Sequence, residues 1–282
     1  MRPVLVTSSG KLGDAIWSLA LVREIKKRDP LRPLVFGVPA PFAQMLPIAL
    51  QQSDYVNGVV ACEDPGFVSP VDALGYGDLC KWEVPAPGGD DAWHEVWRVG
   101  FRSLPRWQLG EHNAYAMGKA LGIQPNLASP WLASNPANMN NRRIAISLHD
   151  ASLTYGQPWL SALVEALPSL LLRNGWREVF LVGGSKATPI HEPLAEMLRR
   201  RELYVMLQGC CFLCGAIAIE TCEAMISIDS ASHALAVGMG RSTLTLRRNH
   251  FLLRTPWSKE IQPTESTETA LQKLSDFLEK GV

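Results

Sequence analysis

Two segments of this chain share one pattern: a short apolar strand, then a turn of small residues, then a helix. The first is residues 7–14 (TSSGKLGD), which lead into a helical stretch at 15–27. The second is residues 226–233 (ISIDSASH), which lead into a helical stretch at 234–238. A strand that passes into a helix in this way is the repeating unit of parallel α/β sheets. Each turn also presents one aspartate, so we expect one carboxylate at a sheet edge in each half of the chain.

Signals for strands and helices alternate through both halves. Strands are predicted at residues 4–6, 34–38, 56–61, 143–148, 178–182, 203–207, 224–228 and 242–246. Helices are predicted at residues 15–27, 42–51, 92–101, 114–121, 160–173, 190–200, 212–222, from 232 onward, and 265–280. Residues 71–79 fit either structure. This alternation favours two α/β domains made of βαβ units, for which 282 residues are sufficient.

A stretch rich in proline and asparagine separates the two halves and is typical of a linker. We therefore predict an N-terminal Rossmann-like domain over residues 1–128 and a linker over 129–141. A C-terminal Rossmann-like domain is predicted over 142–263, followed by a final helix over 264–282.

Composition narrows the class of protein. Hydrophobic residues make up 47% and charged residues 19% of the chain, which is typical of a globular protein. Lys plus Arg and Asp plus Glu are equal at 27 each, and this balance argues against a protein that tracks nucleic-acid backbone. No apolar run is long enough to span a bilayer, and the amino-terminal residues lack the features of a signal peptide. Because six cysteines are few for a disulfide scaffold, we expect a cytoplasmic protein.

Asp14 has two interpretations. It stands at the start of the helix 15–27, where a carboxylate stabilises the helix dipole. The same position lies at the carboxyl edge of a strand, where open α/β sheets place their ligands, so Asp14 can also serve as a general base. Gly10 and Gly13 allow a tight turn that brings backbone N–H groups close to a ligand.

Three residues of the second turn also have two interpretations. Asp229 and Ser230 are good helix N-caps, and His233 can be a buried structural histidine. The alternative is a ligand site in which these side chains contact a phosphate or a sugar. The segment 183–186 (GGSK) is either a diphosphate-binding turn or an ordinary loop between a strand and a helix.

Four cysteines, Cys210, Cys211, Cys214 and Cys222, raise the question of a metal site. Their spacing within a predicted helix is poor for zinc, and no second pair lies nearby. We interpret them as small packing residues and predict no metal.

A basic and aromatic patch follows the first domain's predicted strands. Its members are Trp93, Trp97, Arg98, Phe101, Arg102, Arg106 and Trp107. One interpretation is a helix with aromatic residues in the core and arginines in solvent. The other is an acceptor site, in which a tryptophan stacks on a sugar or base and arginines bind an anion.

Together, the two turns resemble those of the heptosyltransferase-like family 9 of glycosyltransferases, which have the GT-B fold. Residues 8–14 are similar to the turn ending in Gly-Asp with which that family begins. Residues 229–240 (DSASHALAVGMG) are similar to its Asp-Ser-Gly-Pro-x-His segment, and residues 182–184 and 207–209 are similar to its glycine turns. The order of these segments covers nearly the whole chain.

The resemblance implies an α/β fold of GT-B type, with two Rossmann-like domains that face each other across a cleft. We expect the C-terminal helix to return to the N-terminal domain. The N-terminal domain would hold the acceptor, and Asp14 would match the general base of the family. The acceptor site would also include Ser9, Gly10, Lys11, Gly13, Trp97, Arg98 and Arg102. The C-terminal domain would bind the nucleotide sugar through Gly183, Gly184, Gln208, Gly209, Asp229, Ser230 and His233.

The chain also departs from the family pattern. The spacing from Asp229 to His233 is one residue shorter, and Ala231 and Ser232 replace Gly-Pro. The loop 149–156 (HDASLTYG) lacks the lysine that the family usually carries there. We therefore expect Ser152, Thr154 or the backbone to bind the diphosphate, and the donor need not be ADP-heptose.

The predicted activity is metal-independent transfer of a sugar from a nucleotide sugar, which is a substrate and not a cofactor, to an acceptor hydroxyl. The acceptor would be a small saccharide or another hydroxyl compound, anionic acceptors included. Three alternatives stay open: a nucleotide-sugar epimerase, a non-catalytic nucleotide-sugar-binding protein, and a glycosyltransferase that acts on a nucleobase or nucleic acid.

Overall fold

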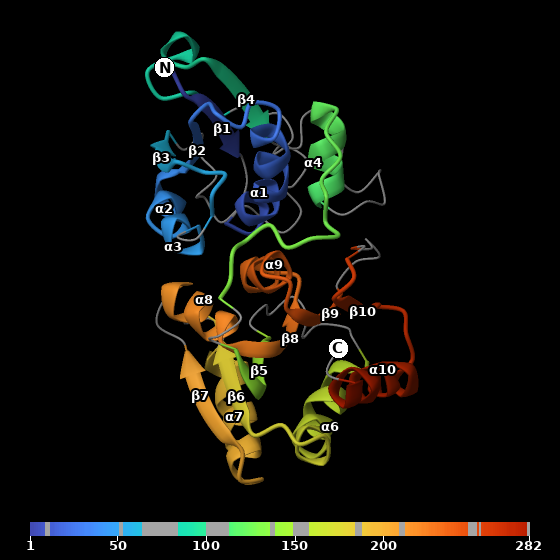
Figure 1. Ribbon diagram of the computed structural model, residues 1–282. Coiled ribbons are helices and arrows are strands. Elements are labelled where there is room, and N and C mark those ends of the chain that lie inside the picture. The colour runs from blue at the N-terminus through green and yellow to red at the C-terminus, as the bar shows by residue number, and fades with distance from the viewer. Residues whose placement is uncertain are drawn as a thin grey trace. The chain divides into compact units, whose positions relative to one another are not determined.

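The computed structural model describes most of the chain, and it divides the chain into two compact units (Figure 1). The described residues are 1–8, 12–50, 53–63, 84–99, 113–135, 139–148, 158–183, 188–208, 212–247, 253 and 255–280. Unit 1 comprises Met1–Ala133 and Phe251–Arg254, and unit 2 comprises Ser134–His250 and Thr255–Val282. The division after Ala133 falls within the predicted linker.

Unit 1 contains a parallel sheet of four strands in the order β3-β2-β1-β4. The strands are β1 (Val4–Ser8), β2 (Leu34–Pro39), β3 (Gly58–Cys62) and β4 (Glu95–Val99). The helices described in this unit are α1 (Leu12–Lys26), α2 (Ala40–Ala43), α3 (Leu46–Ala49), the 3₁₀ turn η2 (Asp90–Ala92) and α4 (Asn113–Leu121). The predicted helix 42–51 is thus two short helices, and residues 71–79 lie outside the described part.

The core of unit 1 forms around α1, which is apolar on nearly every side and packs beside α4. Every residue of β1 is buried, as expected for a central parallel strand. Trp131, which follows α4 in the chain, lies against Trp17 of α1 with 5.2 Å between ring centroids. Its indole N–H donates to the Ile16 carbonyl oxygen at 3.2 Å, so the segment around Trp131 belongs to this core although we predicted a linker there.

The prediction of a helix at residues 92–101 is wrong, because Glu95–Val99 forms the strand β4 beside β1. That prediction relied on aromatic residues four positions apart, which share one face of a helix. Residues four apart also share one side of a strand, because side chains alternate with a period of two. The β-branched and aromatic residues Val96, Trp97 and Val99 favour a strand, and parallel pairing to β1 gives the segment its hydrogen bonds.

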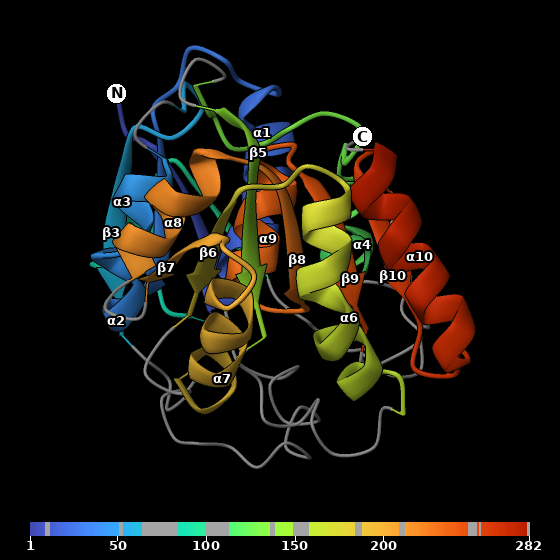
Figure 2. The ribbon, with the colours of Figure 1, turned by 90° about the horizontal axis from the view of Figure 1, so that it is seen from below.

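Unit 2 contains a parallel sheet of six strands in the order β10-β9-β8-β5-β6-β7. The strands are β5 (Asn140–Ser147), β6 (Glu178–Val182), β7 (Tyr204–Gln208), β8 (Cys222–Ile228), β9 (Ser242–Leu246) and β10 (Ser258–Ile261). The helices are α6 (Leu160–Arg173), α7 (Thr188–Arg199), α8 (Phe212–Glu220), α9 (Ala231–Gly238) and α10 (Thr267–Lys280). Helices α8 and α9 cover one face of the sheet, and α6, α7 and α10 cover the other (Figures 1 and 2).

The C-terminal helix α10 belongs to unit 2, so the prediction that it returns to the N-terminal domain is wrong. Its buried residues Ala270, Leu274 and Phe277 join the apolar cluster formed by α6 and the sheet. The Trp176 indole N–H donates to the Leu278 carbonyl oxygen at 3.1 Å, which fixes the end of the helix. Figure 2 shows α6 and α10 lying side by side.

Two parallel α/β units confirm the predicted fold class. Helix 160–173 and strand 178–182 have the predicted bounds, whereas the predicted helix 212–222 ends earlier because Cys222 already belongs to β8. Within the described residues, no helix has the length and apolar character needed to cross a bilayer.

Candidate functional site

Asp14 lies in the first turn of α1, just beyond the carboxyl end of β1. The helix start is tied to the strand end by the Ser18 hydroxyl, which lies 2.8 Å from the Ser8 hydroxyl oxygen and 3.0 Å from the Asp14 carbonyl oxygen. Asp14 is largely buried, with 7% of its surface exposed. Gly13 precedes it within the helix, and the predicted acceptor residues Ser9, Gly10 and Lys11 lie outside the described part of the chain.

The structure separates Trp97 and Arg98 instead of bringing them together. Both belong to β4, and neighbouring residues of a strand point to opposite faces of the sheet. The Arg28 guanidinium lies over the Trp97 ring, 4.9 Å from its centroid, and Arg98 forms an ion pair with Asp90. Their acceptor-binding role stays a prediction, as does that of Arg102, which lies outside the described residues.

The second aspartate turn joins β8 to α9 in unit 2. Ser230 is the N-cap of α9, because its hydroxyl oxygen accepts a hydrogen bond from the His233 backbone N–H at 3.4 Å. The capping interpretation of Ser230 is therefore confirmed. Asp229 precedes it, directly after the carboxyl end of β8, and its side chain is 14% exposed.

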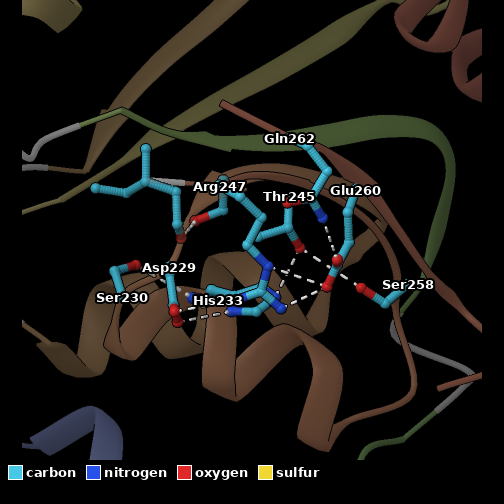
Figure 3. Close-up of polar contacts among 10 residues, drawn as sticks. Asp229, Ser230, His233, Thr245, Arg247, Ser258, Glu260 and Gln262 are labelled. Carbon is cyan, nitrogen blue, oxygen red and sulfur yellow. Dashed lines mark hydrogen bonds and ion pairs between the residues drawn. The ribbon is translucent and has the colours of Figure 1, made fainter. Parts of the chain in front are cut away.

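His233 is fully buried in the first turn of α9 (Figure 3). Its ring Nε2 lies 2.8 Å from the Thr245 hydroxyl oxygen, and its Nδ1 lies 3.5 Å from Asp229 Oδ1. Burial lowers the pKa of His233, and the nearby Asp229 carboxylate offsets this only in part. We infer a neutral imidazole at pH 7, and a proton on Nδ1 fits both contacts.

Arg247 is the central member of this cluster, and sequence reasoning missed it. The side chain is completely buried, and its Nη1 donates to Asp229 Oδ2 at 3.0 Å. On the other side, its Nε and Nη2 donate to Glu260 Oε1 at 3.0 and 2.5 Å. The Gln262 amide N–H donates to Glu260 Oε2 at 2.9 Å. One guanidinium thus joins two carboxylates, as Figure 3 shows.

The sequence does carry a signal for this cluster, in the alternation along β9. Leu244 and Leu246 enter the apolar core on one face of the sheet, whereas Thr245 and Arg247 point to the face covered by α9. On β10, Glu260 pairs in register with Thr245 and therefore shares that polar face. A polar residue at every second position of a buried strand indicates a polar network beneath a helix.

Two other predicted donor residues, Gly183 and Gln208, fall at the same edge of the sheet. Gly183 directly follows β6, and Gln208 ends β7 opposite Val182 of β6. Parallel strands end at one edge, so these backbone positions lie along the same edge as Asp229. Gly184, Gly209, Ser152 and Thr154 lie outside the described residues, and their donor-binding role stays a prediction.

His191 is a second buried histidine near this edge that sequence reasoning did not single out. It comes from the first turns of α7, and its Nε2 accepts a hydrogen bond from the Leu148 backbone N–H at 3.0 Å. The bond connects the end of β5 to the start of α7.

Two of the four cysteines, Cys214 and Cys222, are described, and their surroundings fit packing. Burial raises the pKa of Cys222 to about 12, while Cys214 is half-buried in α8. Cys210 and Cys211 lie outside the described residues. Across the parts of the chain that are described, no three His, Cys, Asp or Glu side chains gather in a way that could hold a metal ion.

Comparisons with known proteins identify the fold. No protein-family model and no curated protein matches the sequence. Among solved structures, a family 9 glycosyltransferase from Veillonella parvula is 12% identical, with a TM-score of 0.65 over 99% of this chain and 97% of that one. The Escherichia coli ADP-heptose LPS heptosyltransferase II is 14% identical, with a TM-score of 0.65 over 99% of both chains. The E. coli heptosyltransferase WaaC with ADP is 15% identical, with a TM-score of 0.62 over 99% of this chain and all (100%) of that one.

These similarities extend along the full length of the chain and confirm the GT-B fold that the resemblance implied. At such low identity they establish the fold and not the activity. The chemistry must therefore be argued from the residues at the sheet edges of each unit.

Proposed function

We propose that this protein is a glycosyltransferase that moves a sugar from a nucleotide sugar to an acceptor hydroxyl. The main support is the similarity in fold to family 9 structures, which covers 97% or more of both chains for the three structures compared above. A second support is that each unit places an aspartate where a parallel strand passes into a helix. A carboxylate at both positions suits a reaction with two substrates.

The donor belongs in unit 2 under this proposal. One of the similar E. coli structures contains ADP, and another contains ADP-2-deoxy-2-fluoro heptose, so a nucleoside diphosphate sugar is the class of donor to test here. The edge formed by Gly183, Gln208 and Asp229 would receive it, with Ser230 and His233 at the start of α9. Backbone N–H groups at a helix start attract the diphosphate and stabilise its growing negative charge as it leaves.

The acceptor belongs in unit 1, and Asp14 is the proposed general base. As the acceptor oxygen attacks the anomeric carbon, Asp14 takes the hydroxyl proton. The bond from the anomeric carbon to the diphosphate oxygen breaks, and its electron pair leaves with the nucleoside diphosphate. This scheme needs no metal, because hydrogen-bond donors stabilise the leaving group.

A donor screen tests the proposal. We expect one class of nucleotide sugar, among ADP, UDP, GDP, CDP and TDP sugars, to raise the melting temperature, since a ligand at 100 times its Kd adds about 2.7 kcal/mol of stability. The free nucleoside diphosphate is the control for binding without the sugar. With the matching donor, release of nucleoside diphosphate should depend on an added hydroxyl acceptor. Stabilisation by no nucleotide sugar would contradict the proposal, and isomerisation of the donor without acceptor would indicate an epimerase instead.

A further inference from the structure

The cluster around Arg247 is built by three neighbouring strands. Ile228 of β8 pairs in register with Leu246 of β9, so the residues that follow them, Asp229 and Arg247, come side by side at the carboxyl edge. The Arg247 backbone N–H donates to the Ile261 carbonyl oxygen of β10 at 2.9 Å, which holds the residue in place beside Glu260. The backbone of β9 and β10 thus sets where the guanidinium lies.

Among the described residues, Arg247 is a cation that lies between the carboxylates of Asp229 and Glu260 and pairs with both. A buried guanidinium without carboxylate partners would be costly, and two carboxylates that share a buried site do not both remain ionised without a cation. Arg247 therefore gives both buried carboxylates a cationic partner.

Arg247 also sets the direction of that carboxylate. It holds Oδ2 at 3.0 Å, while Oδ1 lies 3.5 Å from the His233 ring. Asp229 is the most exposed charged side chain of the network, at 14%, compared with 9% for Glu260 and 0% for Arg247 and His233. A ligand therefore meets Asp229 first, and a carboxylate accepts hydrogen bonds from hydroxyl groups such as those of a sugar.

We propose that Arg247, supported by Glu260, is a positioning residue that orients the Asp229 carboxylate toward the hydroxyl groups of a bound nucleotide sugar. This inference rests on the proposed function. Arg247 acts through Asp229 and has no contact of its own with the reacting atoms.

The first test uses the protein without ligand. Carboxyl NMR titrations, assigned with Asp229→Asn, should show a higher pKa for Asp229 in Arg247→Lys than in wild type, because a lysine lacks the planar fork that serves both carboxylates. Arg143→Lys is the matched control, since Arg143 pairs with Glu178 elsewhere in the same sheet. An unchanged Asp229 titration in Arg247→Lys overturns the proposal.

The second test separates positioning from simple destabilisation. Calorimetry should compare ADP-heptose with ADP, or the equivalent pair for the base that the donor screen selects. The ratio of the two affinities measures what the sugar adds to binding. In Arg247→Lys and in Glu260→Gln, this ratio should fall about tenfold or more, as expected when a charged hydrogen bond is lost. The affinity for the nucleoside diphosphate should stay unchanged. An equal loss for both ligands would mean that the network only holds the fold, and it would overturn the proposal.

Glu260→Gln also guards against misfolding of the arginine variant. It keeps the cation beside Asp229 and removes a neighbouring carboxylate, so we expect a pKa of Asp229 no higher than in wild type, together with a reduced contribution from the sugar. If wild type binds no nucleotide sugar at all, the proposed function fails, and the titration in the free protein still decides whether Arg247 controls Asp229.

Discussion

Asp14 in unit 1 and Asp229 in unit 2 both lie where a parallel strand passes into a helix, yet different interactions define them. The backbone at Asp14 is held by Ser8 and Ser18, which are ten residues apart in the chain. The Asp229 carboxylate is held by Arg247, 18 residues further along, and Arg247 is held in turn by Glu260, another 13 residues away. The difference teaches that two similar aspartate turns can depend on local contacts in one case and on sheet topology in the other.

The largest expected effect of a substitution is on the unfolding free energy of unit 2. Replacing Arg247 by methionine leaves two carboxylates in a nearly dry site, and we expect unit 2 to lose about 3–5 kcal/mol of unfolding free energy, as when a buried ion pair loses one partner. Denaturant unfolding measures the loss. The control is Arg143→Met, which breaks a more exposed pair and should cost about 0–1 kcal/mol. Equal losses of unfolding free energy in the two variants would contradict the inference that Arg247 holds the buried network together.

The next largest effect is expected on the pH dependence of the unfolding free energy. The pKa of His233 is lowered in the folded protein relative to its usual 6.5, so the unfolded chain binds more protons in the range between the two values. Unfolding free energy should therefore fall as the pH drops below 6.5, by up to about 1.4 kcal/mol per pH unit for this one group, until the folded pKa is reached.

Replacing His233 by glutamine should reduce that acid sensitivity, since an amide does not titrate and can still bond to Thr245. The exposed His94→Gln is the control for replacing a histidine elsewhere in the chain. If His233→Gln keeps the wild-type slope of unfolding free energy against pH, other groups account for the loss of stability in acid.

The smallest stability effect is expected at Asp14. Asp14→Asn removes a favourable charge from the first turn of α1, which typically contributes about 0.3–1 kcal/mol. Thermal unfolding measures this change, with the exposed Asp54→Asn as the control. A loss several times larger would mean that Asp14 is mainly structural, and it would weaken its assignment as a base.

The fold could be predicted from the sequence because its signals are local. Helix 160–173 and strand 178–182 show their periodicity within a few residues, and the structure confirms both. The error at β4 arose because a spacing of four residues fits a helix and a strand equally well. The partner of α10 could not be read from the sequence, since an amphipathic helix shows which face it buries and not where.

The candidate site was predicted only in part for a related reason. The turns containing Asp14 and Asp229 are recognisable from consecutive residues. Arg247 and Glu260 become partners of Asp229 only once β8, β9 and β10 are adjacent in the sheet. Apolar and polar residues alternate along β9, and the alternation continues one residue beyond it to Arg247. This pattern indicates the polar network.

Transfer kinetics and donor affinity of Asp14→Asn and Asp229→Asn, measured side by side, test the division of roles between the two aspartates. The account predicts that Asp14→Asn lowers kcat about 10²–10⁴-fold, as for loss of a general base, with unchanged donor Kd. Asp229→Asn should instead weaken binding of the donor. Full transfer activity in Asp14→Asn, or unaltered donor affinity in Asp229→Asn, would contradict it.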